Sequence, residues 1–357
     1  MHQIRFPARG GFHETVKQRV AQYFADRRQV TTGDWRLFLK TGVILAWLAG
    51  SYAFLVFGST SLPVTMLAVL ALSQGCALVG FNIMHDGAHG SYAHSTTMNW
   101  LMGGILNVIG GSQRLWRLKH NRLHHIYTNI HPLDNDLQTS GLLRFSPAQP
   151  WRPWHRFQHL YAFAVYSLLT LEWVTTGDWR KLVSGHIGPY KLPPPTVADV
   201  GVFVATKLGY FGYALILPGF FHPWLHVLLA FVAVHLLLGV TLSMAFQLAH
   251  IVERTSFPTP DAHTGMMPTG WAEHEVETTV DFAPHNKVAT WYLGGLNFQI
   301  EHHLFPKICH IHYPALSTMV AATCHEFALP YVCYPTVRSA IVGHYRFLKR
   351  MGRRPNA

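Results

Sequence analysis

The sequence reads GGLNFQIEHHLFP from Gly294 to Pro306. Two adjacent histidines, His302 and His303, stand there beside a glutamine and a glutamate in a largely apolar stretch. Two earlier segments have the same character, HDGAH at residues 85–89 and HNRLHH at residues 120–125. We call these three segments the histidine boxes. Together they predict one dinuclear metal site assembled from distant parts of the chain.

The spacing of the histidines supports this metal hypothesis. His85 and His89 are four residues apart, as are His120 and His124, so each pair shares one face of a helix. Adjacent histidines project about 100° apart on a helix, which suits two neighbouring ions better than one. Neutral imidazole binds iron, copper and zinc, and the four cysteines form no CxxC pair. A non-haem di-iron centre is the best fit to so many nitrogen ligands.

The histidines outside the boxes have a simpler interpretation. The chain has 25 histidines in 357 residues, so some of them cluster by chance. We interpret the isolated ones as packing or interface residues, namely His155, His159, His186, His226 and His235.

The composition predicts an integral membrane protein. Hydrophobic residues make up 49% of the chain and charged residues only 13%, which is too apolar for an ordinary soluble protein of this size. Four apolar runs are long enough to cross ~30 Å of hydrocarbon. They lie at residues 41–57, 62–84, 200–221 and 224–249. We therefore expect an all-α fold with four transmembrane helices in two hairpins and a cytoplasmic, histidine-rich di-iron cap.

The distribution of positive charge predicts the orientation. Of the 28 Lys and Arg residues, eight precede the first span, ten lie between the second and third, and nine follow the fourth. The positive-inside rule then places both termini and all three boxes in the cytoplasm, for a bacterial protein at the inner membrane. The remaining cation, Lys207, falls inside the third span, where we expect it to snorkel to the interface.

The domain organisation follows from the same runs. Residues 1–40 form a basic cytoplasmic segment, residues 41–345 a single domain, and residues 346–357 a basic tail. The run at 161–171 is too short to span and suits an interfacial helix.

The three boxes resemble those of the membrane-bound fatty acyl desaturases. Their HxxxH, HxxxHH and QxxHH patterns are together highly specific, and the resemblance extends from about residue 40 to 345. Gln299 stands where most of that superfamily has histidine, which is similar to the front-end and linoleoyl-CoA-like branch. Echoes such as the run from His312 to Leu316 agree with it.

The resemblance implies a set of metal ligands. Family members carry a further histidine at the end of the fourth span, and FQLAH at residues 246–250 matches that place. The implied ligands are His85, His89, His120, His124, His125, His250, His302 and His303. Gln299, Asp86 and Glu301 are possible ligands or supporting residues, and Asp134, Asp136 and Glu253 could also orient imidazoles. Which histidine serves which iron stays open.

The resemblance also implies the activity. Breaking an unactivated C–H bond is beyond acid–base side chains, so the chemistry needs metal-activated oxygen. The expected enzyme uses O2 and two iron ions to introduce a double bond into a fatty acyl chain carried by CoA, a membrane lipid or acyl carrier protein. No haem-binding HPGG motif is present, so electrons are expected from a separate acidic carrier, a ferredoxin or cytochrome b5 with its reductase. No nucleic-acid partner is expected.

Several alternatives share part of this pattern. Hydroxylation, epoxidation or acetylenation of an acyl chain would use the same boxes, because small shifts in substrate placement decide the outcome. A non-redox zinc hydrolase needs fewer ligands and an open water position. A metal transporter would place ionisable residues in mid-span, whereas the boxes lie at span ends.

Overall fold

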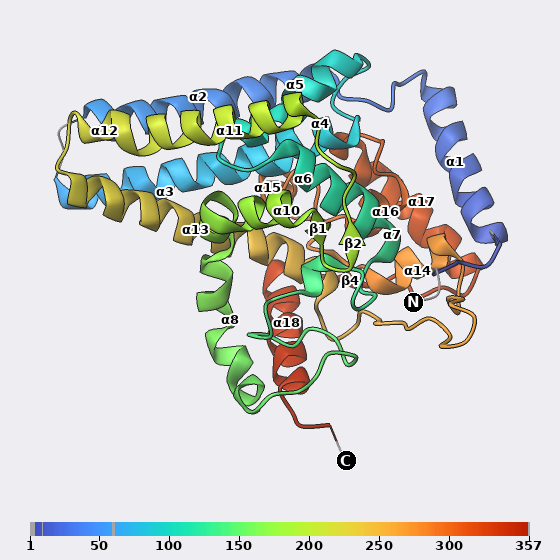
Figure 1. Ribbon diagram of the computed structural model, residues 1–357. Coiled ribbons are helices and arrows are strands. Elements are labelled where there is room, and N and C mark those ends of the chain that lie inside the picture. Colours follow the sequence, from blue (N-terminus) through green and yellow to red (C-terminus); the bar gives the residue numbers. More distant parts are fainter. Residues whose placement is uncertain (1–3, 9, 59–60, 356–357) are drawn as a thin grey trace. The chain divides into compact units, whose positions relative to one another are not determined.

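The computed structural model describes residues 4–8, 10–58 and 61–355 and is mostly helical (Figure 1). Two small two-stranded sheets depart from the predicted all-α fold. The chain divides into two compact units, each built from separate stretches of sequence. The terminal unit comprises residues 1–32, 119–162 and 245–357, and the span unit comprises residues 33–118 and 163–244.

Four helical segments are long and apolar enough to cross a membrane, as the sequence predicts. They are Trp35–Phe57, Leu62–His89, Val197–Gly219 and Trp224–His250. The first begins at Trp35 rather than at residue 41, because the Asp34 side chain caps it by accepting a hydrogen bond from the Arg36 amide. The predicted pairing of these helices into two hairpins stays a prediction.

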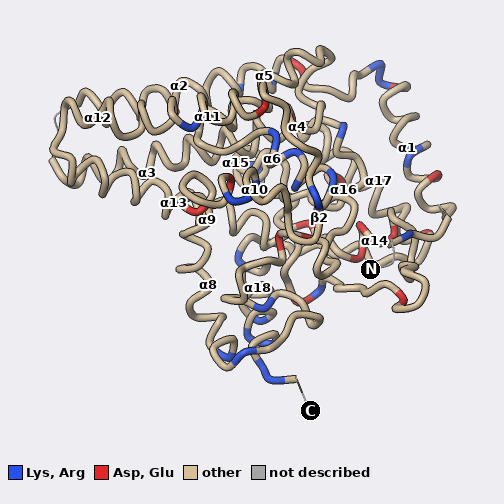
Figure 2. Tube along the Cα trace, viewed as in Figure 1, with Lys and Arg blue, Asp and Glu red and all other residues tan. Residues whose placement is uncertain are grey.

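The long helices of the span unit lie side by side (Figure 1). α2 (Trp35–Phe57) packs along α3 (Leu62–Val79). Gln74 of α3 donates to Thr241 of α13 (Trp224–His250) at 3.3 Å. Figure 2 shows these helices almost free of charged residues, and many of their outward side chains are large and apolar. Such a surface suits lipid rather than water.

Two segments at the histidine boxes are π-helical rather than α-helical: one directly precedes the first box and the other contains most of the second. η1 (Gly80–Met84) leads into α4 (His85–His89), and η2 (Leu118–His124) leads into α7 (His125–Tyr127). A π-helix bonds residue i to i+5, so it widens the turn and changes which side chains meet. Sequence periodicity did not predict this.

The span unit contains further helices and one pair of strands. Its helices are α5 (Thr96–Val108), α6 (Gln113–Arg117), α9 (Leu169–Glu172), η5 (Trp173–Gly177), α10 (Asp178–Ser184), α11 (Val197–Phe211), η6 (Gly212–Ile216) and α12 (Leu217–Gly219). The strands β1 (His186–Ile187) and β2 (Tyr190–Lys191) pair antiparallel. α8 (Gln158–Ser167), where an interfacial helix was expected, begins in the terminal unit and ends in the span unit.

Helices of the terminal unit pack around the third box. α1 (Gly11–Arg27), α14 (Trp271–Thr278), α16 (Gln299–Leu304) and α17 (Tyr313–Glu326) share a buried apolar cluster that includes Phe12, Val276, Ile300 and Val320. The predicted basic N-terminal segment therefore contributes a core helix, α1. The terminal unit also contains η3 (Asn135–Leu137), η4 (Pro153–Phe157), β3 (Asp281–Phe282), α15 (Lys287–Tyr292), η7 (His310–His312), β4 (Cys333–Tyr334) and α18 (Val337–Met351).

The last helix crosses the predicted boundary between domain and tail. α18 continues to Met351, so residues 346–351 are helical. Side chains close its C-terminal end: Gln158 donates to the Leu348 carbonyl, Arg144 to that of Met351 and Trp151 to that of Gly352. The helix is thereby fixed at its end rather than frayed.

Candidate metal centre

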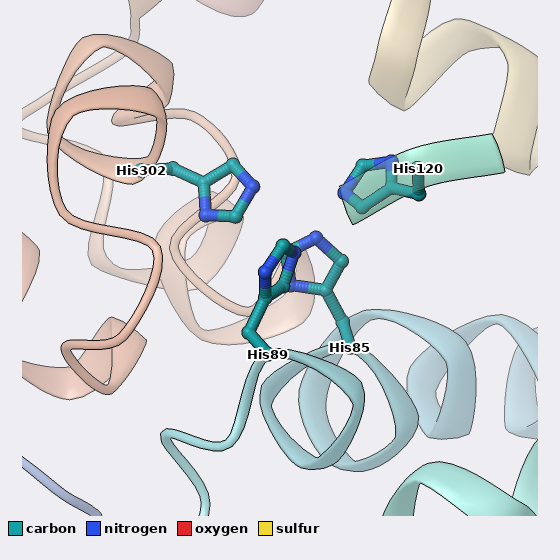
Figure 3. A group of neighbouring side chains, drawn as sticks. All are labelled: His85, His89, His120 and His302. Atoms are coloured by element: carbon teal, nitrogen blue, oxygen red, sulfur yellow. The ribbon is translucent and has the colours of Figure 1, made fainter. Parts of the chain in front are cut away.

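The first box lies in the span unit. His85 and His89 leave α4 on the same side (Figure 3), with ring centroids 4.7 Å apart, as their i, i+4 spacing predicts. The Trp116 ring contacts both imidazoles edge-on. Trp116 belongs to a buried apolar cluster with Met84, Ala88 and Leu106. The imidazole pair therefore has an apolar support on its own unit.

The terminal unit contains the other six predicted ligands, and all six are buried. Their ligand atoms form two groups in which every pair of nitrogens lies within 4.8 Å: His124, His250 and His303 in one, and His125, His302 and His303 in the other. Three nitrogens at that spacing can hold an ion. The two groups share His303, whose single coordinating nitrogen can serve one ion, so the groups are neighbours.

The π-helical turn decides how the second box is presented. The Nε2 atoms of His120 and His125, five residues apart, approach to 3.2 Å. The His120 ring also lies nearly parallel to that of His302, at 18° and 6.0 Å between centroids (Figure 3). The i, i+4 spacing predicts that His120 and His124 share an α-helical face. Their rings do stack at 5.3 Å, but the wider turn brings the i, i+5 nitrogens together.

Hydrogen bonds fix the orientation of four imidazoles through their Nδ1 atoms. His303 Nδ1 lies 2.7 Å from Glu275, and His302 Nδ1 lies 3.1 Å from the Tyr313 hydroxyl. His250 Nδ1 is 3.4 Å from the Thr278 carbonyl. His124 Nδ1 is 3.3 Å from both oxygens of Asp134. With Nδ1 engaged in this way, Nε2 is the coordinating atom, which is the usual arrangement around metal-binding histidines.

Charged groups around His124 set its electrostatics. Burial lowers the pKa of His124, but Asp134 and Asp136 outweigh burial, and the pKa is raised overall. Lys119 forms an ion pair with Asp136. Burial raises the pKa of Asp136, yet Lys119 and His124 hold it down at about 2. The His124 Nε2 is buried and has no hydrogen-bond partner among the described residues, which leaves its lone pair for a metal.

The remaining acidic and amide candidates behave differently from one another. The Gln299 amide nitrogen lies 3.0 Å from His250 Nε2, so Gln299 borders the first group of nitrogens. Glu301 accepts a hydrogen bond from the Tyr331 hydroxyl at 3.1 Å. Glu253 lies 3.8 Å from Arg346, away from the boxes. Asp86 is buried on α4. Asp134 and Asp136 both reach the His124 imidazole.

Sequence reasoning missed the carboxylate on His303. The box patterns assign no role to Glu275, which is fully buried on α14. It also accepts from the Thr128 hydroxyl at 2.9 Å. Ala272, Glu275 and Val276 share one face of that helix, so helical periodicity could have placed Glu275 with the buried residues. Tyr313 was noted only as an echo of a family motif, without a role.

Two of the isolated histidines are packing residues, as expected. His235 lies 2.5 Å from the Tyr210 hydroxyl and 3.1 Å from Thr170, and His155 contacts the Gly141 carbonyl at 3.0 Å. Burial is the main cause that lowers the pKa of His155. His186 and His226 are exposed.

Comparisons with known proteins agree with the geometry. The family model described as "Fatty acid desaturase" matches residues 59–335. An sn-1 linoleoyl-lipid 6-desaturase of Synechocystis sp. is 36% identical over 354 residues, covering 98% of each chain. A protein of the same description from Arthrospira platensis is also 36% identical, covering 99% of this chain and 96% of its own. An acyl-lipid (8-3)-desaturase of Physcomitrium patens is 37% identical over 96% of this chain and 72% of its own length.

Proposed function

The chain belongs to the fatty acid desaturase family, and on that premise we propose that its histidine boxes hold two iron ions that serve the desaturation of a lipid-bound acyl chain. The protein is an integral membrane oxidoreductase that introduces a double bond into a fatty acyl chain. The observation that carries the metal assignment is the common orientation of the imidazoles in the terminal unit. Four of them, His124, His250, His302 and His303, have Nδ1 held by protein groups. Ligand nitrogens within each of two histidine groups lie within 4.8 Å of one another.

The proposed ligands are the eight histidines implied by the boxes. Six of them lie in the terminal unit, where two adjacent groups of nitrogens support a pair of ions. We assign His85 and His89 to the same centre on ligand chemistry and on the HxxxH pattern of the family. Nitrogen donors without thiolate suit iron. Gln299, beside His250, is a further candidate ligand.

The protein's own residues prepare the site before any substrate binds. Glu275 and Asp134 hold the Nδ1 protons of His303 and His124, so the coordinating nitrogens keep one direction. Tyr313 does the same for His302. Burial of all six histidines excludes water, which would otherwise compete with substrate oxidation.

The proposed reaction removes two hydrogens from the acyl chain and reduces O2 to water. Bound iron supplies the activation of O2 that C–H cleavage requires. Two hydrogens leave adjacent carbons of the acyl chain, and a C=C bond forms between those carbons. O2 takes four electrons, two from the substrate and two from an external donor, together with two protons from the substrate and two from solvent, and ends as two molecules of water. The protein's part is to hold one C–C pair of the acyl chain in reach of the metals.

The proposed substrate is an acyl chain esterified in a membrane glycerolipid. The relatives are named linoleoyl-lipid and acyl-lipid desaturases, and this favours a lipid over CoA or acyl carrier protein. We further propose that both termini and the boxes face the cytoplasm of a bacterium, because the three regions rich in Lys and Arg, which are the N-terminal segment, the loop between the second and third spans and the C-terminal region, then lie on one side.

Lipid analysis tests the substrate. The chain is expressed in a bacterial host of known lipid composition, fed linoleate, and each lipid class is analysed by mass spectrometry with location of the double bonds. We expect a new double bond in glycerolipid acyl chains and none in cells that express His124→Ala. A product formed only on acyl-CoA would overturn the lipid assignment, and a hydroxylated chain would overturn desaturation.

Metal analysis tests the centre independently of the product. Purified protein is expected to contain two iron ions per chain, and single His→Ala variants in the boxes should lose iron. Full activity with zinc alone, or with one metal ion per chain, would contradict the di-iron assignment. The exposed residue His226 supplies a matched control, because His226→Ala should keep both iron and turnover.

A further inference from the structure

A buried lysine lies near the middle of the third span. Lys207 is the only Lys, Arg, Asp or Glu within Val200–Gly219. Its side chain is 2% exposed, so the expectation that it snorkels to the interface is wrong. Its Nζ contacts Asp178 at 3.0 Å, the Gly110 carbonyl at 2.6 Å and the Trp173 carbonyl at 3.4 Å. An ammonium group in a membrane span is costly unless its charge and its donors are satisfied. These three acceptors satisfy Lys207.

The ion pair alone does not explain why the span carries this charge. Apolar residues of similar volume often replace a buried ion pair without loss of stability. The shortest contact of Lys207 is with a main-chain carbonyl, that of Gly110. A hydrophobic replacement would leave that carbonyl without its donor. The structural consequence of Lys207 is therefore to be sought at Gly110.

Gly110 ends α5 in a turn with no spare room. Its φ is +93°, and a Cβ built on it would lie 2.8 Å from Val174 and 2.9 Å from the Tyr210 ring. The Gly111 amide donates to the Leu106 carbonyl at 3.0 Å, which ties the turn to α5. Holding the Gly110 carbonyl therefore holds the C-terminal end of α5.

α5 in turn crosses α4 at main-chain contact. A Cβ on Gly103 would lie 3.1 Å from the Ala88 nitrogen, and a Cβ on Gly87 would collide with the Gly103 nitrogen. Leu106 of α5 packs on Met84 and Ala88, next to the first box. Because two backbones in contact cannot slide without a clash, the position of α5 sets the position of α4 and of His85 and His89.

We propose that Lys207, held by Asp178, is a positioning residue that fixes the Gly110 turn and, through α5, the helix that carries the first histidine box. The proposal rests on the proposed metal centre. Its action is mechanical: Lys207 touches neither substrate nor metal.

The test replaces the ion pair without leaving a charge behind. Lys207→Met combined with Asp178→Leu removes both charges and keeps the site apolar, so the fold should survive, with a thermal midpoint lowered only by the loss of the hydrogen bond to Gly110. We expect kcat to fall by about tenfold or more with little change in KM, because small misplacements of reacting groups are costly. Cobalt(II), loaded in place of iron, should show a changed visible spectrum, which reports the ligand geometry without turnover.

Three further variants separate positioning from charge balance. Lys181→Met removes another lysine, 3.8 Å from the same carboxylate, and should leave kcat and the cobalt spectrum unchanged. Asp178→Asn keeps an acceptor for Lys207 and the bond to Gly110, so it should keep the native spectrum even if it unfolds more easily. Lys207→Met alone should be the least stable, because Asp178 stays buried without its partner.

The outcomes are distinct. A double variant with native kcat and native cobalt spectrum would overturn the positioning role. So would an Asp178→Asn variant whose spectrum is as altered as that of Lys207→Met, because charge pairing rather than the Gly110 bond would then matter. Failure of the unmodified protein to bind cobalt or iron would instead reject the proposed metal centre.

Discussion

At the scale of single residues, the hydrogen-bond partner of each imidazole determines the direction of its coordinating nitrogen. Glu275 illustrates this. It is buried, accepts from Thr128 and lies 2.7 Å from His303 Nδ1. The box motif predicts His303, but a supporting carboxylate 28 residues away in the sequence belongs to another helix and has no fixed spacing to search for.

Glu275→Gln should weaken metal binding. The amide can still accept from His303, but it brings no negative charge to the ring, and such changes typically reduce metal affinity by about 10–100-fold. Iron content after dialysis against a graded chelator measures the effect. Glu277→Gln, on the same helix and only partly buried, is the matched control. Equal iron retention in both variants would remove Glu275 from the support of His303.

His344 predicts a pH dependence of stability. It is buried on α18 and donates from Nδ1 to the Ile251 carbonyl at 2.6 Å. Burial lowers its pKa from 6.5 to about 4. The unfolded chain then takes up a proton near pH 6.5 while the folded protein does not. Stability from this residue is therefore complete above about pH 6.5 and is lost as the pH falls towards 4.

The variant His344→Asn tests that dependence. Its amide can donate to the same carbonyl and has no group that titrates in this range. Between pH 7 and pH 5 the thermal midpoint in detergent should fall less for His344→Asn than for the unmodified protein. Parallel falls in the two proteins would show that other groups, such as His274, carry the acid sensitivity.

At the scale of elements, apolar runs predicted the spans but not the turns that aim the ligands. Length and hydropathy identify four helices, because each must satisfy its own backbone in lipid. The π-helical segments η1 and η2 gave no such signal, since their residues fit an α-helix equally well. Spacing therefore predicts which histidines belong to the boxes, but it does not predict that the Nε2 atoms of His120 and His125 approach each other.

The crossing of α4 and α5 should tolerate no added methyl group. Gly87→Ala would drive its Cβ into the backbone of Gly103, so we expect lower stability and loss of iron. Gly42→Ala is the control: this glycine of α2 would meet no heavy atom within 4 Å, and alanine is the better helix former by about 1 kcal/mol. Thermal midpoint and iron content of the two variants measure the contrast. A stable, iron-replete Gly87→Ala protein would mean that α4 can shift.

At the scale of the whole molecule, positively charged residues clearly outnumber negatively charged ones. Lys and Arg number 28 against 17 Asp and Glu, for a net charge of +11. In Figure 2, cations gather along α18 and the adjoining end of the chain, and Arg346, Lys349 and Arg350 are exposed there. The sequence alone predicts this excess. It could not predict that each unit is assembled from separated segments, because those contacts join residues far apart in the chain.

The excess charge predicts a salt-dependent supply of electrons. An acidic carrier should be steered to a basic protein, and screening acts over ~8–10 Å at physiological salt. With limiting carrier and its reductase, the turnover rate should fall as salt rises from low to a few tenths molar. A rate independent of salt would reject steering. Turnover with a nicotinamide cofactor and no carrier would reject the separate donor itself.

α13 has a consequence of its own. It runs without a break from Trp224 to His250, so the same rod that crosses the lipid ends in a candidate ligand. One residue inserted upstream would rotate His250 by about 100° and displace it by about 1.5 Å. The number of residues in this helix therefore sets both the direction of the His250 side chain about the helix axis and its position along the axis. Insertions of seven residues, close to two full turns, should restore the direction of the imidazole while still displacing it along the axis.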